Sequence, residues 1–213
     1  MKSKRITAMA LSLVVLLLST GCSNATTKSN TDISILGVTF GKTPTSVSAF
    51  TESSSVTDMF GSDCLILHTE GWDASEVGYS DGIHKWNTYT VDTNSEILSG
   101  AVYTDIDDEW IYLIYFNGEG TTPLDDLNIC IGDVPLQGNC REAVLTALGE
   151  PYSGGAYSGL DYDSIDYYRY MWCVNGSDRP NLTITFYPSG AFYTFCYKVP
   201  MNSWDKQLSS GGN

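Results

Sequence analysis

The feature that most limits the fold of this chain is a regular alternation of apolar and polar residues near its C-terminus. Between Leu182 and Tyr187, every second side chain is large and apolar, and the positions between them include two threonines. A period of two residues is that of a β-strand with one buried face and one exposed face. Because such a strand must hide its apolar face, the segment predicts a sheet covered on one side by another layer.

The next segment, Ala191–Val199, continues this alternation after a turn that contains Pro188 and Gly190, so the two segments predict a hairpin. In the second strand we expect one face, the more apolar one, to carry Ala191, Tyr193, Phe195, Tyr197 and Val199, and the other to carry Phe192, Thr194, Cys196 and Lys198. Four more strands are predicted at Lys85–Val91, Leu98–Thr104, Trp110–Phe116 and Tyr167–Val174.

Helix signals precede each group of strands. Thr43 is a candidate N-cap, and Pro44 suits the first position of a short helix. Asn139 is a second candidate N-cap, with Glu142 three residues later as in a capping box. Gly149 is expected to end that second helix.

These elements predict an α+β fold of two tandem repeats, each a short helix plus an antiparallel β-meander. The first repeat spans residues 33–120 and the second spans residues 121–200. The two repeats could form one curved sheet backed by helices. Residues 201–213 are expected to be a C-terminal tail.

One motif in the second repeat resembles a known family. Residues 138–144 (GNCREAV) and 148–151 (LGEP) are similar to the motif that opens repeats of the β-lactamase-inhibitory-protein-like fold. Outer-membrane assembly lipoproteins of the small-protein-A type share that motif, and residues 41–47 (GKTPTSV) resemble it more weakly. The resemblance implies a helix-backed concave sheet, and a surface lipoprotein that binds protein through loops and the sheet face.

The first 21 residues have the pattern of a bacterial export signal. Basic residues precede the apolar run Ile6–Leu18, which is too short to cross the ~30 Å apolar core of a bilayer comfortably. Gly21 and Cys22 resemble the lipobox of lipoproteins, whose signal peptidase cuts before a lipid-modified cysteine. We therefore expect residues 1–21 to be a signal peptide, Cys22 to carry lipid and residues 22–32 to be a flexible tether. The predicted location is extracytoplasmic, and Ser23 leaves the outer membrane open if the source has one.

The formal net charge of −14 excludes nucleic acid as a partner, because an acidic surface repels phosphate groups. Three of the basic residues precede Cys22, so the mature chain would be more acidic still. Such a charge suits solubility at a crowded envelope surface, or alternatively a basic partner.

Catalytic patterns are weak, and we predict that the chain is not an enzyme. No G-x-S-x-G segment occurs, and only two histidines are present. Cys64 and His68 would share a strand face, but a buried thiol beside an unrelated histidine explains them as well. A hydrolase that uses paired carboxylates is the remaining enzymatic alternative.

Two acidic clusters are candidate cation sites. Asp161, Asp163 and Asp166 crowd one loop, and residues 105–109 crowd a hairpin turn with Asp105, Asp107, Asp108 and Glu109. Calcium prefers several oxygen ligands, so it is the ion these clusters would suit. Neither cluster fits an EF-hand loop, and solvated turn residues are the alternative. No resident cofactor is predicted.

Aromatic residues are abundant, with 14 Tyr and 5 Trp. Segments such as 167–172 carry aromatics on both faces, more than one buried face requires. Exposed Tyr and Trp suit protein recognition or stacking against sugars. We predict a non-enzymatic binding surface for a protein partner, with a glycan or cell-wall polymer as the alternative. The candidate binding residues are Trp86, Tyr112, Tyr168, Tyr170 and Trp172.

Five cysteines follow Cys22, so at least one stays unpaired within the chain. Cys173 and Cys196 could form a disulfide if their strands are adjacent. Cys130 and Cys140 flank a predicted strand–helix turn and could pair instead. Free thiols are the remaining alternative for all of them.

Overall fold

The structure is a computed structural model that describes residues 31–73, 85–91, 98–118, 124–157 and 167–200. Its main body is a nine-stranded antiparallel sheet. Along that sheet the strands follow the order β10 (Ser153–Tyr157), β11 (Tyr167–Trp172), β12 (Leu182–Phe186), β13 (Phe192–Lys198), β7 (Trp110–Gly118), β6 (Leu98–Asp105), β5 (Lys85–Val91) and β4 (Leu65–Asp73), and β3 (Thr45–Ser46) pairs with β7 off this path.

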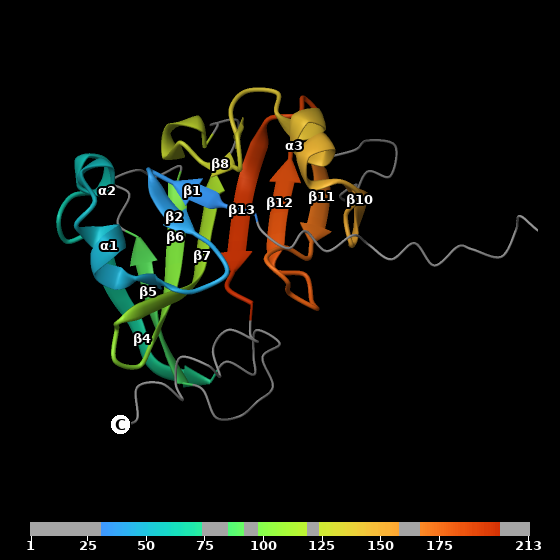
Figure 1. Ribbon diagram of the computed structural model, residues 1–213. Helices are drawn as coiled ribbons and strands as arrows, with labels where there is room; N and C mark the ends of the chain where they lie inside the picture. The colour runs from blue at the N-terminus through green and yellow to red at the C-terminus, as the bar shows by residue number, and fades with distance from the viewer. Residues whose placement is uncertain (1–30, 74–84, 92–97, 119–123, 158–166, 201–213) are drawn as a thin grey trace, which may run out of the picture.

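A small second sheet and three helices cover one face of the large sheet. The small sheet contains β2 (Val38–Phe40), β1 (Ile33–Ile35), β8 (Cys130–Ile131) and β9 (Val134–Pro135). The helices are α1 (Val47–Thr51), α2 (Ser54–Phe60) and α3 (Arg141–Leu148), and Asp125–Leu127 forms a 3₁₀ turn. Figure 1 shows the small sheet in front of β6 and β7, with α1 and α2 at one end and α3 beside β11 and β12.

The main hydrophobic core lies between these two layers. On the large sheet it includes Ile114, Phe116 and Ile184, which are fully buried. The covering layer contributes Phe40 and Phe60, and the Phe60 ring stacks on Phe116 at 6.1 Å between centroids. We call this side of the large sheet the covered face.

A buried asparagine ties the start of the described chain to the large sheet. Asn175 Oδ1 accepts from Thr31 N at 2.7 Å, and Asn175 Nδ2 donates to Thr31 O at 3.0 Å. The same amide donates to the hydroxyl of Tyr197, which in turn donates to Gly41 O at 2.6 Å. The covering layer is therefore attached by buried polar contacts as well as by apolar packing.

All six predicted strands are confirmed, with bounds that differ by at most two residues at either end. The helix ends agree less well. Helix α3 begins one residue later than expected, because Cys140 is its N-cap instead of Asn139, whereas Gly149 ends it as predicted. In the first half, Thr45 and Ser46 form β3, and the Ser46 side chain caps α1 by accepting from Ala49 N at 3.1 Å.

The predicted α+β class of two helix-plus-meander repeats is wrong. The chain is mostly antiparallel β, with 48% of the described residues in strands and 17% in helical segments, and it forms a β-rich sandwich. The segment expected to hold the first helix breaks into α1 and α2, of five and seven residues, and helices so short depend on tertiary packing. β10 and the pairing of β1 with β8 were not predicted, and the latter joins segments almost 100 residues apart.

A bulge in the β12–β13 hairpin also changes the predicted faces. Thr185 pairs with Thr194, but the next pair is Phe186 with Phe192, so Tyr193 is the extra residue. Phe192 is consequently fully buried, and Tyr193 is turned away from the core. The predicted placement of these two side chains is wrong because strict alternation cannot anticipate a bulge.

Candidate functional site: a groove on the second face of the sheet

The face of the large sheet opposite the covered face is hollowed over β7, β11, β12 and β13. We call this area the groove face. Side chains two residues apart on each strand point to it, as Arg169 and Met171 do on β11 and Thr183 does on β12. The hollow has a volume of about 420 Å³, which lies within the range of small-ligand sites.

Hydroxyl groups dominate the lining of this groove. Three tyrosines and three threonines contribute, and most of them are half-buried, so their hydroxyls lie at the border between protein and solvent. They are Tyr115, Tyr167, Tyr193, Thr183, Thr185 and Thr194. A ligand in this groove would therefore meet many hydrogen-bond donors and acceptors, together with apolar ring faces.

Four tyrosine rings form a ladder at one end of the groove. Tyr157 of β10 stacks on Tyr167 at 5.2 Å with an interplanar angle of 10°. Tyr167 contacts Tyr193 edge-on at 6.2 Å, and Tyr193 lies 4.5 Å from the ring of Tyr187. This ladder offers a row of aromatic surface, with Tyr157 40% exposed at its outer end.

The charge of the groove is opposite to that of the chain. Its lining includes Arg169 and Lys198, whereas no Asp or Glu is among the described residues that line it. Arg169 is exposed, and its neighbour across the edge is Gly155 of β10, which has no side chain to cover it. Among the described residues, the charged side chains that line this hollow are therefore basic, although the chain as a whole has a net charge of −14.

A second hollow of about 300 Å³ continues the groove toward β6. It shares Tyr115, Cys196 and Lys198 with the first hollow and adds Tyr103 and Leu113. No acidic side chain from the described ranges lines it either. The two hollows together make an elongated site rather than a single round pocket.

Burial keeps the Cys196 thiol and the hydroxyls of Tyr115 and Tyr193 protonated at neutral pH. Burial raises the pKa of the Cys196 thiol to about 11, although Lys198 and Arg169 both act to lower it. Burial also raises the pKa values of Tyr115 and Tyr193 above the usual value for tyrosine. Cys196 is thus a poor nucleophile, and Tyr115 and Tyr193 are neutral hydrogen-bonding groups.

The aromatic residues selected from the sequence lie elsewhere. Trp86 and Tyr112 are only 3% and 6% exposed, and their rings meet edge-on at 5.1 Å. Trp172 is 2% exposed and donates from Nε1 to Gly149 O at 3.1 Å. These three side chains stabilise the structure, and in this conformation they are not available to a partner.

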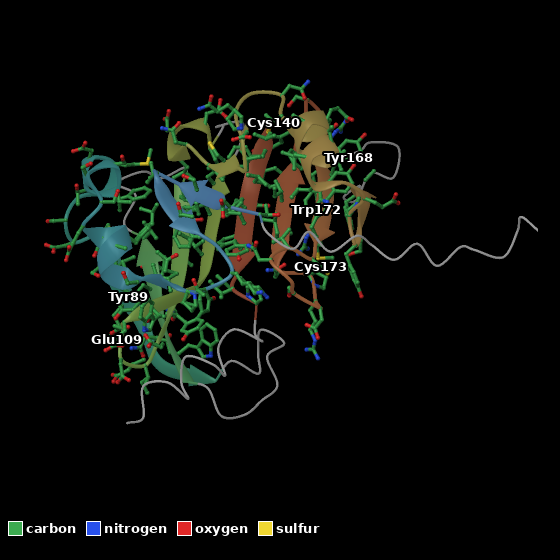
Figure 2. The ribbon with its side chains drawn as sticks, viewed as in Figure 1. Tyr89, Glu109, Cys140, Tyr168, Trp172 and Cys173 are labelled. Atoms are coloured by element: carbon green, nitrogen blue, oxygen red, sulfur yellow. The ribbon has the colours of Figure 1, made fainter. Side chains whose placement is uncertain are left out.

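The two remaining candidates, Tyr168 and Tyr170, are half-buried against the core. The guanidinium of Arg141 at the start of α3 lies 4.2 Å from the centre of the Tyr168 ring. Figure 2 shows Tyr168 and Trp172 along β11, beside α3. The predicted binding set therefore belongs mainly to the packed parts of the molecule, and the groove uses the other side of β11.

The acidic cluster at residues 105–109 organises a hairpin turn. The Asp108 carboxylate accepts from Thr104 Oγ1 at 2.6 Å, Tyr89 OH at 2.7 Å and Asn87 Nδ2 at 3.0 Å. Figure 2 shows Tyr89 close to Glu109 at this end of the molecule. Within the described ranges no three His, Cys, Asp or Glu side chains are grouped to hold a metal. The other predicted cation site, Asp161, Asp163 and Asp166, lies outside the described residues.

The environment of this turn shifts the pKa values of Asp105 and Asp108 in opposite directions. Burial acts to raise the pKa of Asp108, but the hydrogen bonds from Thr104, Tyr89 and Asn87 outweigh it and lower the pKa. Burial raises the pKa of Asp105, although its carboxylate accepts from the backbone N–H groups of Glu109 and Trp110. Both carboxylates are therefore used by the fold.

The structure does not form the proposed Cys173–Cys196 disulfide. Strand β12 lies between β11, which Cys173 follows, and β13, which contains Cys196. Cys130 and Cys140 are also free thiols, as is Cys64. A bridge across a whole intervening strand would exceed the reach of two cysteine side chains.

Cys64 and His68 do not form a reactive pair. Cys64 is fully buried, and burial raises the pKa of its thiol. His68 is exposed, and its Nδ1 lies 2.9 Å from Thr69 Oγ1. Irregular pairing of β4 between Leu67 and Thr69 changes the simple alternation that had placed both on one face.

The sequence contains a signal for the groove residues, although it is a weak one. Arg169 is flanked by core-facing Tyr168 and Tyr170, so strand alternation alone places it on the opposite face. Which face of β11 is covered depends on where α3 packs, and the sequence pattern does not state this. Tyr193 could not be assigned correctly, because its orientation depends on the bulge.

Comparisons with known proteins give no further guide: no family model, no curated protein and no solved structure matches this chain. In the part of the chain that the structure describes, no helix is long and apolar enough to cross a membrane.

Proposed function

We propose that this chain is a lipid-anchored, extracytoplasmic binding protein without a catalytic role, and that its groove face binds a carbohydrate. The lipid on Cys22 would hold it at a membrane surface through the tether of residues 22–32. The folded part would present the groove to polymers of the cell envelope.

The observation that carries this proposal is the combination of a ligand-sized hollow and its lining. Tyrosine rings offer flat apolar surface, and the surrounding hydroxyls offer hydrogen bonds, which together match the two sides of a sugar ring. The lining lacks a carboxylate or histidine among the described residues, and its one thiol is protonated at neutral pH. These features favour binding over hydrolysis.

Binding of the full-length protein, purified in detergent, to a glycan array tests the proposal. We expect signal on a limited set of oligosaccharides, and at least a fivefold loss for Tyr193→Ala, because truncating a tyrosine that is central to a binding site costs about 1 kcal/mol or more. Tyr152→Ala is the matched control, since this tyrosine is 55% exposed and is not part of the groove lining. No binding to any glycan would contradict the proposed function.

The anchor is tested separately by the intact mass of the protein isolated from the envelope fraction. The expected mass lacks residues 1–21 and includes a diacylglycerol on Cys22. Cys22→Ala should leave an unlipidated chain. An intact mass that retains residues 1–21 would contradict the anchor but would leave the groove proposal unaffected.

A basic protein partner remains the second candidate, and one observation favours it. Among the described strands, β4 is an edge of the large sheet, and its adjacent residues Ile66 and Leu67 are each 50% exposed. An extended segment could add to this edge, and the acidic net charge suits a basic one. A protein captured from envelope extract by wild type and by Arg169→Gln, but lost with Ile66→Lys, would support this candidate. Equal capture by all three would remove it.

A further inference from the structure

The exposed arginine of the groove face points to the kind of carbohydrate. We infer that the ligand is an acidic oligosaccharide, a carboxylate of which is bound by Arg169 while its rings lie against the tyrosines and threonines beside it. This inference rests on the proposed carbohydrate-binding function and adds the charge of the ligand.

The first argument is the local sign of charge. The chain has 25 acidic and 11 basic residues, yet the two hollows are lined by two basic residues and by no acidic one in the described ranges. Exposed carboxylates more than about 8 Å from the guanidinium of Arg169 are largely screened at physiological ionic strength. An anionic group is favoured beside Arg169.

The second argument is the exposure and orientation of Arg169. It makes no ion pair with any described residue, and Gly155 leaves one side of it uncovered. It lines the hollow together with Tyr115, Tyr193 and Cys196, which places it on the groove side of β11. A guanidinium in that position can bind a carboxylate through two parallel hydrogen bonds.

The test uses tetragalacturonic acid and its fully methyl-esterified form, which keeps the rings and removes the charges. Titration calorimetry with the full-length protein should show binding of the acid and at least tenfold weaker binding of the ester, the effect of one lost charged hydrogen bond. Arg169→Gln should weaken binding of the acid about tenfold, and Arg169→Lys should restore part of it. Lys42→Gln, an equal change of charge on the exposed loop after β2, should have no effect.

The possible outcomes separate the two proposals. Equal binding of acid and ester, unaffected by Arg169→Gln, would overturn the acidic ligand but leave carbohydrate binding intact. Binding of hexaglutamate as tight as that of tetragalacturonate would show a site for acidic peptides instead. No binding of acid, ester or hexaglutamate would overturn this inference, while positive array results with neutral glycans would still support the proposed function. Thermal unfolding of each variant controls for loss of fold.

Discussion

On the covered face of the large sheet, Phe116 and Ile184 are fully buried, whereas their chain neighbours Tyr115 and Thr183 line a groove on the opposite face. Successive side chains of one strand thus contribute either to the core or to the groove. Burial of apolar side chains stabilises the sandwich on one side, and half-buried hydroxyls and cations face solvent on the other. Aromatic residues occur on both sides, so their number alone says little about binding.

The largest expected effect comes from removing a ring on the covered face. Phe116→Ala deletes a fully buried ring that stacks on Phe60, and should lower the free energy of unfolding by about 3–5 kcal/mol. Tyr115→Ala, one residue away on the groove face, should cost less than half as much and should weaken glycan binding. Urea denaturation measures the free energy of unfolding of both variants, and equal losses would contradict the distinction between the two faces.

A smaller effect is expected where the covering layer is fastened to the large sheet. Asn175→Gly removes the three hydrogen bonds that this buried side chain makes with Thr31 and Tyr197 without straining the positive φ, and should cost about 2–3 kcal/mol. Asn128 also has a positive φ but is exposed, so Asn128→Gly should change stability by less than about 0.5 kcal/mol. A similar cost for both would mean that the buried hydrogen bonds contribute little at Asn175.

The acidic turn should behave as part of the scaffold, with a pH dependence of known sign. Asp108 has a pKa below 3.8 in the folded state, so its contribution to stability is present above pH 4 and is lost as pH falls through that lowered value. The difference in unfolding free energy between wild type and Asp108→Asn should therefore be larger at pH 6 than at pH 3. Asp105 has a raised pKa, so its contribution to stability is present below pH 3.8 and is lost as pH rises through the raised value. The difference in unfolding free energy between wild type and Asp105→Asn should therefore be smaller at pH 6 than at pH 3.

The smallest effect on stability is expected for the groove cation. Arg169 is exposed and makes no ion pair in the described structure, so Arg169→Gln should change the unfolding free energy by less than about 0.5 kcal/mol. Arg141 lies over the Tyr168 ring and pairs with Glu142, so Arg141→Gln should cost about 1 kcal/mol. Chemical denaturation compares the two, and a larger loss at Arg169 would indicate a structural rather than a binding role.

Much of the strand content could be predicted, because alternation reports which residues share a face. Leu182, Ile184 and Phe186 were identified as one face, and all three are fully buried. The layers could not be predicted in the same way. The contact of β1 with β8 and the packing of α3 on β11 depend on distant segments, and no local pattern encodes them.

The site could be predicted only in part, for a related reason. Tyr168, Tyr170 and Trp172 looked as suitable for binding as Tyr167 and Arg169, because they alternate along the same strand. Helix α3 covers the side of β11 that carries Tyr168, Tyr170 and Trp172, and the groove therefore lies on the side that carries Tyr167 and Arg169. The bulge that turns Tyr193 into the groove adds one residue to a hairpin whose turn gave no sign of it.

The most direct test of the central claim, that the groove face binds the ligand, is methyl NMR of the full-length protein titrated with tetragalacturonate. The γ-methyl signals of Thr183, Thr185 and Thr194 report on the groove, and the δ-methyl signals of Ile114 and Ile184 report on the covered face. We predict shifts of the threonine signals and unchanged isoleucine signals. Shifts confined to isoleucines, including Ile66 on the β4 edge, or no shift at any methyl group, would contradict the account.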